Sequence, residues 1–143
     1  MTRSLRILIA DDEPDMRDYF QKLLPRMGYE VVGAAQNGQE LVDLNLSLQP
    51  DLIITDIKMP LMDGIDAAIR IFQDRPAPII LVSAYHDPEL IARAEADHVL
   101  SYLVKPIKAA DLQTTIALAV HRFAQFQALQ QALDDRDKER QQP

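Results

Sequence analysis

The feature that most constrains the fold is a series of five short apolar segments, separated by stretches with helical periodicity. The segments are residues 5–10, 29–35, 51–55, 79–82 and 100–104. Short, mostly apolar runs are typical of strands that are buried on both faces. Strands that alternate with helices predict a parallel sheet with helices packed on both of its sides.

The stretches between these segments carry the spacing and the end signals of helices. Met16, Phe20 and Leu24 recur at helical spacing, and Gly28 ends that first helix. Asp12 is expected to cap its start. The predicted helices cover residues 13–27, 41–48, 65–72, 88–96 and 108–142. Because crossovers must be right-handed, this order predicts a flavodoxin-like, doubly wound five-stranded sheet with strand order 2-1-3-4-5.

Polar and charged residues follow four of the five predicted strands. The first strand leads into Asp11 and Asp12, the third into Asp56, the fourth into Ser83 and the fifth into Lys105. Taken singly, each has an ordinary structural interpretation: a helix cap, a loop carboxylate, a loop hydroxyl and a solvated surface charge. Because ligands of such sheets bind beyond the carboxyl ends of the strands, the joint pattern predicts a site there.

The charges of that predicted site favour a metal ion and a phosphoryl group together. Three carboxylates about 5 Å apart repel one another by roughly 3 kcal/mol per pair at an effective dielectric constant near 20. With one lysine added, the three carboxylates still carry a net charge near −2. A hard divalent cation such as Mg²⁺ or Mn²⁺ balances this charge, and it prefers carboxylate and phosphate oxygens.

The composition excludes several other kinds of protein. The 143 residues suffice for one domain, and the formal net charge of −7 argues against direct binding to nucleic acid or an anionic membrane. The chain has no cysteine, which excludes disulfides and suits the cytoplasm. The apolar run at residues 5–10 is too short for a signal peptide or a membrane span.

Four motifs at these strand ends resemble the receiver domain of two-component response regulators. They are Ile-Leu-Ile-Ala-Asp-Asp-Glu-Pro at 7–14, Asp-Leu-Ile-Ile-Thr-Asp-Ile-Lys-Met-Pro-Leu-Met-Asp-Gly at 51–64, Leu-Val-Ser-Ala-Tyr at 81–85 and Tyr-Leu-Val-Lys-Pro at 102–106. Singly the short motifs are weak, but in this order they are specific. The resemblance covers about residues 5 to 122, and Asp97-His98 stands where many relatives carry glycine.

The resemblance implies a phosphoryl-accepting switch rather than a stand-alone enzyme. Asp56 corresponds to the nucleophile, which takes the phosphoryl group from a sensor histidine kinase or a phosphotransfer protein. Asp12 corresponds to a direct ligand of Mg²⁺ and Asp11 to a ligand through water. Asp56 and the backbone carbonyl of Lys58 correspond to the other members of the metal site. The side chains of Lys58 and Tyr85 correspond to positions that tune the lifetime of the phosphate.

The resemblance also assigns the groups that sense the phosphoryl group. Lys105 supplies a point charge for its oxygens, and Ser83 supplies a hydroxyl. Tyr102 corresponds to the switch aromatic that turns inward when Ser83 moves, although a half-buried structural tyrosine is an equally good interpretation. The peptide bond between Lys105 and Pro106 is expected to be cis. Phosphorylation would then reshape the face formed by the fourth helix, fifth strand and fifth helix.

The last predicted helix extends beyond the expected end of a receiver near Phe123. We therefore expect a receiver domain at residues 1–123 and a helical extension or linker at residues 124–143, with truncation before an output domain as one interpretation. Ile116, Ala119 and Phe123 begin a heptad seam that Phe126 continues. A helix that projects alone into water is marginally stable, so pairing in a homodimer or with a further domain is expected.

The segment after Phe123 leaves the output of the protein open. Arg122-Phe123 and residues 133–140 faintly resemble the linker of ANTAR regulators, whose output domain binds RNA to prevent transcription termination. A stand-alone receiver, or one cut from a different regulator with a DNA-binding output, fits equally well.

Three rival functions remain for comparison. A flavin-type cofactor binder needs a glycine- and serine-rich cradle after the first strand, where this chain has Asp11-Asp12-Glu13-Pro14. An aspartate-based phosphatase needs paired aspartates after the first strand, two residues apart. A degenerate receiver, acting as a structural dimerisation or interaction module, would not need Asp56, Ser83 and Lys105 together.

Overall fold

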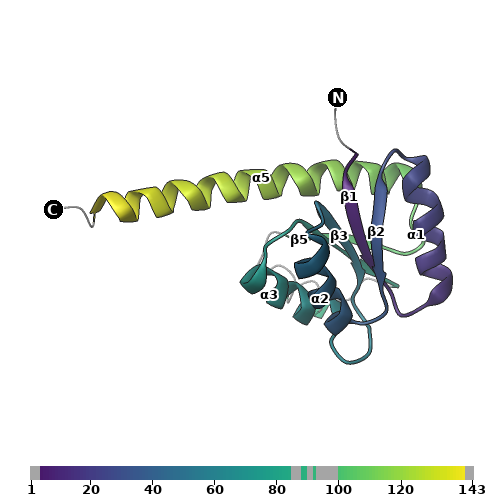
Figure 1. The fold of residues 1–143 in the computed structure, drawn as a ribbon. Coiled ribbons are helices and arrows are strands. Elements are labelled where there is room, and N and C mark those ends of the chain that lie inside the picture. Colours follow the sequence, from purple (N-terminus) through teal and green to yellow (C-terminus); the bar gives the residue numbers. More distant parts are fainter. Residues whose placement is uncertain (1–3, 85–87, 90–91, 93–99, 141–143) are drawn as a thin grey trace.

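The computed structural model describes residues 4–84, 88–89, 92 and 100–140, and it contains five strands and four helices in those ranges (Figure 1). The elements in chain order are β1 (Arg6–Ala10), α1 (Pro14–Arg26), β2 (Glu30–Ala35), α2 (Gly38–Leu48), β3 (Leu52–Asp56), α3 (Gly64–Asp74), β4 (Ile79–Ser83), β5 (Leu100–Val104) and α5 (Ala109–Arg140).

The five strands form one parallel sheet with the order β2-β1-β3-β4-β5, which confirms the predicted topology. The central strand β3 pairs Thr55 with Ala10 of β1 and Asp56 with Val82 of β4. Because all strands run in the same direction, their carboxyl ends lie along one edge of the sheet.

Alternate residues of each strand pack into two separate cores, one on each face of the sheet. On β1, Ile7 and Ile9 pack with α1 and α5, whereas Leu8 and Ala10 pack with α2 and α3. All four side chains are almost fully buried. Burial on both faces explains why the strand segments are continuously apolar instead of alternating.

Short polar residues fix the starts of two helices, as helix-capping chemistry requires. Asn37 Oδ1 accepts the backbone N–H of Glu40 at 2.8 Å, and Asp63 Oδ1 accepts that of Asp66 at 2.7 Å. The expectation that Asp12 caps α1 is wrong. Glu13 occupies the N-cap position and its side chain makes no capping bond, while its backbone N–H donates to Asp11 Oδ1 at 2.9 Å.

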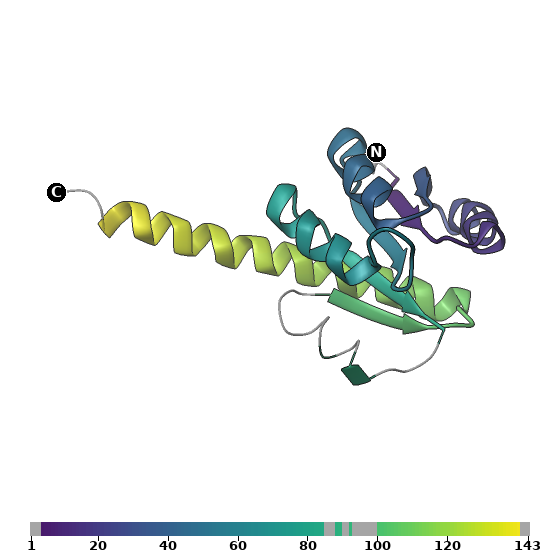
Figure 2. The same cartoon turned by 90° about the horizontal axis from the view of Figure 1, so that it is seen from below.

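The helix α5 runs far beyond the sheet, which confirms the predicted extension of the last helix (Figures 1 and 2). One detail of the prediction is corrected: Phe126 lies past the sheet but packs within its own chain. Its ring centroid lies 6.2 Å from that of Phe72 on α3, and Phe123 lies 6.4 Å from the same ring. Residues 127–140 are all exposed.

Several expectations fall outside the described residues. They concern most of the helix expected at residues 88–96, together with Tyr85 and the Asp97-His98 pair. Among the helices that the structure describes, none has both the length and the apolar character needed to cross a membrane.

Candidate functional site

The fold brings four predicted site residues to one edge of the sheet. Asp11 directly follows β1, Asp56 is the last residue of β3, Ser83 is the last residue of β4, and Lys105 directly follows β5. Because parallel strands end at the same edge, Asp11 and Lys105 are in contact although they are far apart in the sequence.

Three carboxylates converge at this edge. Oxygen atoms of Asp11, Asp12 and Asp56 all lie within 4.8 Å of one another. Asp11 and Asp56 are buried, with 1% and 9% of their surface exposed, whereas Asp12 faces solvent. Burial strengthens the repulsion between such carboxylates, since less water screens them.

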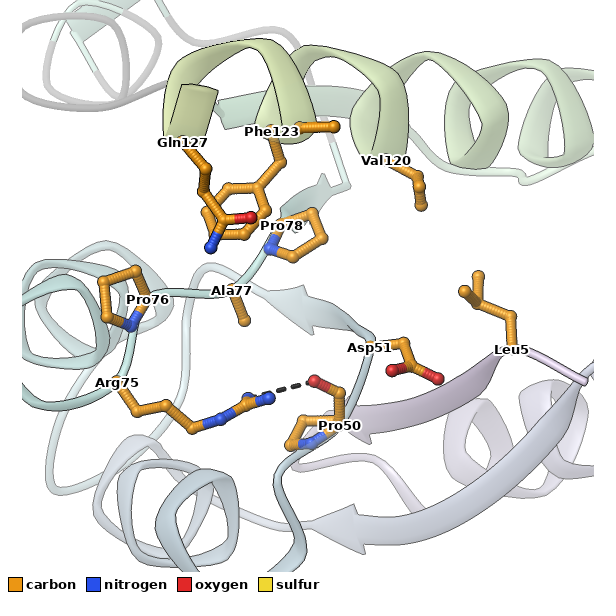
Figure 3. Close-up of a pocket in the computed structure, with 11 residues that line it drawn as sticks. Leu5, Pro50, Asp51, Arg75, Pro76, Ala77, Pro78, Val120, Phe123 and Gln127 are labelled. Carbon is orange, nitrogen blue, oxygen red and sulfur yellow. Dashed lines mark hydrogen bonds between the residues drawn. The ribbon is translucent and has the colours of Figure 1, made fainter. Parts of the chain in front are cut away.

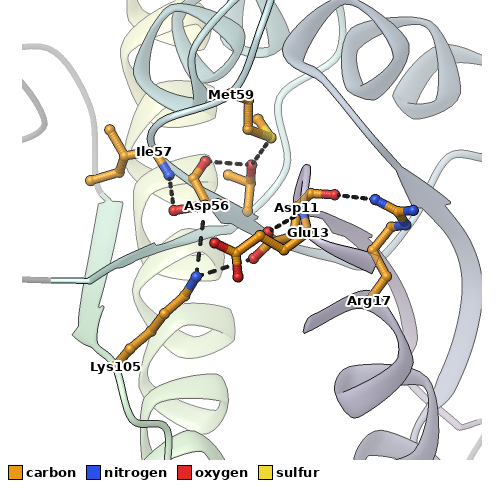
Figure 4. Close-up of polar contacts among 8 residues, drawn as sticks. Asp11, Glu13, Arg17, Asp56, Ile57, Met59 and Lys105 are labelled. Carbon is orange, nitrogen blue, oxygen red and sulfur yellow. Dashed lines mark hydrogen bonds and ion pairs between the residues drawn. The ribbon is translucent and has the colours of Figure 1, made fainter. Parts of the chain in front are cut away.

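The ammonium of Lys105 lies between the two buried carboxylates (Figure 4). Its Nζ atom is 3.4 Å from Asp11 Oδ2 and 3.7 Å from Asp56 Oδ2. The Lys105 backbone N–H donates to the carbonyl of Ser83 at 2.8 Å, which anchors the loop after β5 to the end of β4. Only 18% of the lysine side chain is exposed, so it directs its charge into the site.

Backbone groups fix the orientation of Asp56. The Ile57 N–H donates to Asp56 Oδ1 at 2.8 Å, and Thr55 donates its hydroxyl to the Asp56 carbonyl at 2.9 Å. The Gly64 N–H donates to the Ile57 carbonyl at 2.7 Å. A Cβ atom on Gly64 would lie 2.1 Å from the Asp56 carbonyl oxygen, so this close approach of α3 requires glycine.

Burial and nearby charge change the acidity of Asp56. Burial is the largest cause and the Asp11 carboxylate the next, and together they raise the pKa of Asp56 to about 6. Lys105 and the Ile57 N–H act in the opposite direction. A raised pKa at a sheet edge that also carries a lysine and two more carboxylates is typical of a functional site.

The donor set fits a hard divalent cation. The three clustered side chains offer oxygen atoms alone, which suits Mg²⁺ or Mn²⁺. Lys58 lies two residues beyond Asp56 in the same loop and is exposed. Arg17 of α1 also holds the backbone of Asp11, because its guanidinium donates to the Asp11 carbonyl at 2.8 Å.

The predicted switch residues and the predicted cis peptide bond lie within or just after β4 and β5. Ser83 is 4% exposed at the end of β4, and Tyr102 is half-buried in β5, packed against the core that contains α2 and α3. The peptide bond between Lys105 and Pro106 is cis, as the resemblance implied.

Sequence reasoning missed Arg17 and the close packing of Gly64. Arg17 lies six residues after Asp11, near the start of α1, and no sequence motif distinguishes it from an ordinary solvated arginine. Gly64 does stand in the quoted motif Asp63-Gly64, where a glycine at a helix start signals a close backbone approach.

A separate cavity of about 330 Å³ lies at the opposite end of the strands, between α5 and the starts of β3 and β4 (Figure 3). Arg75 borders it and donates to the Pro50 carbonyl at 2.9 Å and to Asn45 Oδ1 at 3.1 Å. Burial lowers the pKa of the Arg75 guanidinium. These bonds tie α2 to α3, so we assign Arg75 a structural role.

The chain matches known proteins along most of its length. Residues 7–117 match the family model of the response regulator receiver domain. Over 125 residues the chain is 46% identical to the transcriptional regulatory protein PdtaR of Mycobacterium tuberculosis, covering 87% of this chain and 61% of that protein. Over 104 residues it is 38% identical to the chemotaxis protein CheY of Thermotoga maritima, covering 72% of this chain and 87% of that one.

A solved structure agrees with these matches. The response regulator domain of Thermotoga maritima CheB is similar with a TM-score of 0.77 at 29% identity, covering 83% of this chain and 98% of that one. The chain thus spans only about three-fifths of the length of PdtaR, but nearly all of a solved receiver domain. The sheet order, the acidic edge and these matches agree that the chain belongs to the response regulator receiver domain family.

Proposed function

We propose that this receiver domain accepts a phosphoryl group on Asp56 from a phosphohistidine of a sensor histidine kinase or phosphotransfer protein in the cytoplasm. The observation that carries the proposal is the convergence of three carboxylates and the Lys105 ammonium around a buried aspartate. A carboxylate oxygen of Asp56 forms a bond to phosphorus while the bond from phosphorus to the histidine nitrogen breaks. The electron pair leaves with the imidazole, which then takes up a proton.

The metal of this proposal is Mg²⁺ or Mn²⁺, held by Asp11, Asp12, Asp56 and the backbone carbonyl of Lys58. When bound, it neutralises negative charge on the carboxylates and on the transferring phosphoryl oxygens. The protein's own groups do the positioning. The Ile57 N–H orients Asp56, and Lys105 offers a further positive charge on the side of Oδ2.

A groove beside the site supports docking of the phosphodonor protein. Met16, Tyr19, Pro106 and Ile107 line a space of about 460 Å³ that Lys105 also borders. An apolar surface next to the acceptor carboxylate gives a partner protein a place to pack while its phosphohistidine reaches Asp56.

The response to phosphorylation is proposed to pass through Ser83 and Tyr102. The phosphoryl group adds charge and three acceptor oxygens at the end of β3, and the Ser83 hydroxyl offers a donor at the end of the neighbouring strand. Movement of Ser83 would then reposition Tyr102, changing the face formed by the fourth helix, β5 and α5. Lys58 and Tyr85 are proposed to tune the hydrolysis of the acyl phosphate.

The receiver is further proposed to work within a longer regulator or as a homodimer through α5. Support comes from the share of PdtaR that the chain spans and from the exposed seam beyond Phe126. An RNA-binding output of the ANTAR type, a DNA-binding output and a stand-alone receiver are separated by reading the coding sequence downstream of Pro143. The domain boundary near Phe123 is tested by limited proteolysis.

Intact-mass measurement after incubation with acetyl phosphate tests the central proposal. We expect a gain of one phosphoryl mass that requires Mg²⁺ and is lost in Asp56→Asn. Absence of any gain, with acetyl phosphate and with a panel of phosphohistidine donors, would favour the degenerate receiver that acts through constitutive protein contacts.

A further inference from the structure

A hydrogen bond joins α1 to the loop that carries Lys105. The Tyr19 hydroxyl donates to the backbone carbonyl of Ile107 at 2.8 Å, linking residues 88 positions apart in the sequence. Tyr19 is 39% exposed, and its ring stands edge-on to that of the buried Phe20, with centroids 5.6 Å apart, so the ring rests on the surface of the core. This contact lies on the same side of the molecule as the acidic edge, because Tyr19 and Lys105 border the same groove.

Two hydrogen bonds to its backbone hold the loop between β5 and α5, one near each of its ends. At its start, the Lys105 N–H donates to the Ser83 carbonyl at 2.8 Å. At its end, Ile107 is 8% exposed and packs in the core with Phe20 and Leu112. The Tyr19 hydroxyl holds the carbonyl of this same Ile107, and so fixes the direction in which the loop enters α5.

The position of the Lys105 ammonium depends on this loop. The distances from Nζ to the carboxylates, 3.4 Å to Asp11 and 3.7 Å to Asp56, exceed those of a tight charge-assisted hydrogen bond. The carboxylates alone therefore hold the ammonium loosely, and the backbone that carries Lys105 has to place it.

We propose that Tyr19 is a positioning residue for phosphoryl transfer: its hydroxyl fixes the loop of residues 105–107 and thereby holds the Lys105 ammonium at Asp56. The inference rests on the proposed function, because it concerns the rate at which Asp56 takes the phosphoryl group. Tyr19 itself does not touch the reacting atoms and acts through the loop.

Tyr19→Phe removes the hydroxyl and keeps the ring that lines the groove and packs on Phe20. Tyr29→Phe is the matched control, because it deletes the same group just before β2, at the opposite edge of the sheet. With acetyl phosphate and saturating Mg²⁺, we expect the rate constant for Asp56 phosphorylation to fall roughly three- to tenfold in Tyr19→Phe, the factor that one neutral hydrogen bond supports. Tyr29→Phe should match the wild type.

A double-mutant cycle separates positioning from a general loss of structure. In a Lys105→Ala background, Tyr19→Phe should cause no further loss of rate, because the group that it positions is absent. A wild-type rate in Tyr19→Phe, or an equal loss with and without Lys105, would overturn the inference.

Hydrogen exchange supplies a measurement that does not depend on phosphorylation. The peptide covering residues 103–109 should exchange faster in Tyr19→Phe than in the wild type or Tyr29→Phe, and unchanged exchange would refute the anchoring role. Failure of the wild-type chain to accept a phosphoryl group would count against the proposed function instead, while the exchange result still decides the anchoring.

Discussion

The ammonium of Lys105 lies 3.7 Å from Oδ2 of Asp56, so a cation from the end of β5 faces the carboxylate at the end of β3. The same ammonium is shared with Asp11, which leaves three carboxylates for one lysine in this cluster. We expect this excess negative charge to make the stability of the protein depend on pH and on bound metal.

The stability of the metal-free protein should fall as pH rises through the titration of Asp56. Its folded pKa of about 6 lies above the ordinary value of about 4, so the folded state binds the proton more tightly than the unfolded state. The penalty for ionising Asp56 is absent well below pH 4 and complete above pH 6. Two pKa units correspond to at most about 3 kcal/mol.

Asp56→Asn tests this, because asparagine does not ionise. In urea denaturation with EDTA, it should raise the free energy of unfolding at pH 7.5 by up to about 3 kcal/mol and by less than about 1 kcal/mol at pH 4. Asp15→Asn, in the exposed first turn of α1, is the control. A gain that is the same at both pH values would contradict the raised pKa.

Removing Asp12 should abolish the stabilisation by metal without damaging the fold. Asp12 is the exposed member of the cluster, so Asp12→Asn leaves the buried core intact. Mg²⁺ at a hundredfold excess over its dissociation constant should stabilise the wild type by about 2.7 kcal/mol. Thermal unfolding with and without Mg²⁺ measures this, and an undiminished metal effect in Asp12→Asn would exclude it as a ligand.

Gly64→Ala should destabilise the protein more than Gly33→Ala. The new Cβ at position 64 would meet the Asp56 carbonyl at 2.1 Å, and backbone yields poorly. At position 33 the nearest atom is the flexible end of Leu48, at 2.8 Å. We expect a loss of about 2–3 kcal/mol for Gly64→Ala and about 1 kcal/mol for Gly33→Ala in urea denaturation. Equal losses would refute the tight packing at Asp56.

Ser83→Ala should uncouple phosphorylation from the change in β5. The variant should still gain the phosphoryl mass, but the shift of the Tyr102 ring signals on phosphorylation should fall to less than half of the wild-type shift. Ser101→Ala, which removes a buried hydroxyl from β5 instead, serves as the control. Identical Tyr102 shifts in phosphorylated Ser83→Ala and wild type would exclude this route.

Phe126→Ala and Leu133→Ala distinguish packing within the chain from pairing between chains. Phe126 contacts Phe72, so its loss should cost about 1–2 kcal/mol at any protein concentration. Leu133 is 46% exposed, so its loss should cost less than about 0.5 kcal/mol in a monomer. A larger cost that grows with protein concentration would show that α5 pairs with a second copy.

The sheet was predictable from the sequence because its strands are buried on both faces. Residues 52–56 and 79–83 are uniformly buried, and such runs give an unambiguous apolar signal. The start of α1 was not predicted correctly, because residue type favours Asp12 over Glu13 as an N-cap, and Glu13 is the residue that occupies this position. Only the fold shows that the Asp11 side chain already holds the Glu13 N–H.

The convergence of the three carboxylates and Lys105 was predicted, but the residues that support them were not. The carboxylates and Lys105 stand at strand ends, which topology alone brings together. Tyr19 and Arg17 donate hydrogen bonds to backbone carbonyls near these residues. Every residue has a backbone carbonyl, so the sequence does not show which one will accept such a bond. The packing of Phe126 on Phe72 depends on where α3 ends relative to α5, which residue spacing along one helix cannot reveal.

The ring cluster of Phe72, Phe123 and Phe126 gives α5 the geometry of a lever. The 14 residues after Phe126, up to Arg140, span about 21 Å at 1.5 Å per residue. A tilt of α5 by about 10° at these rings would therefore carry Arg140 through about 4 Å. A small tilt of α5 at the ring cluster is thus amplified along the helix, and its far end moves by about the size of a side chain.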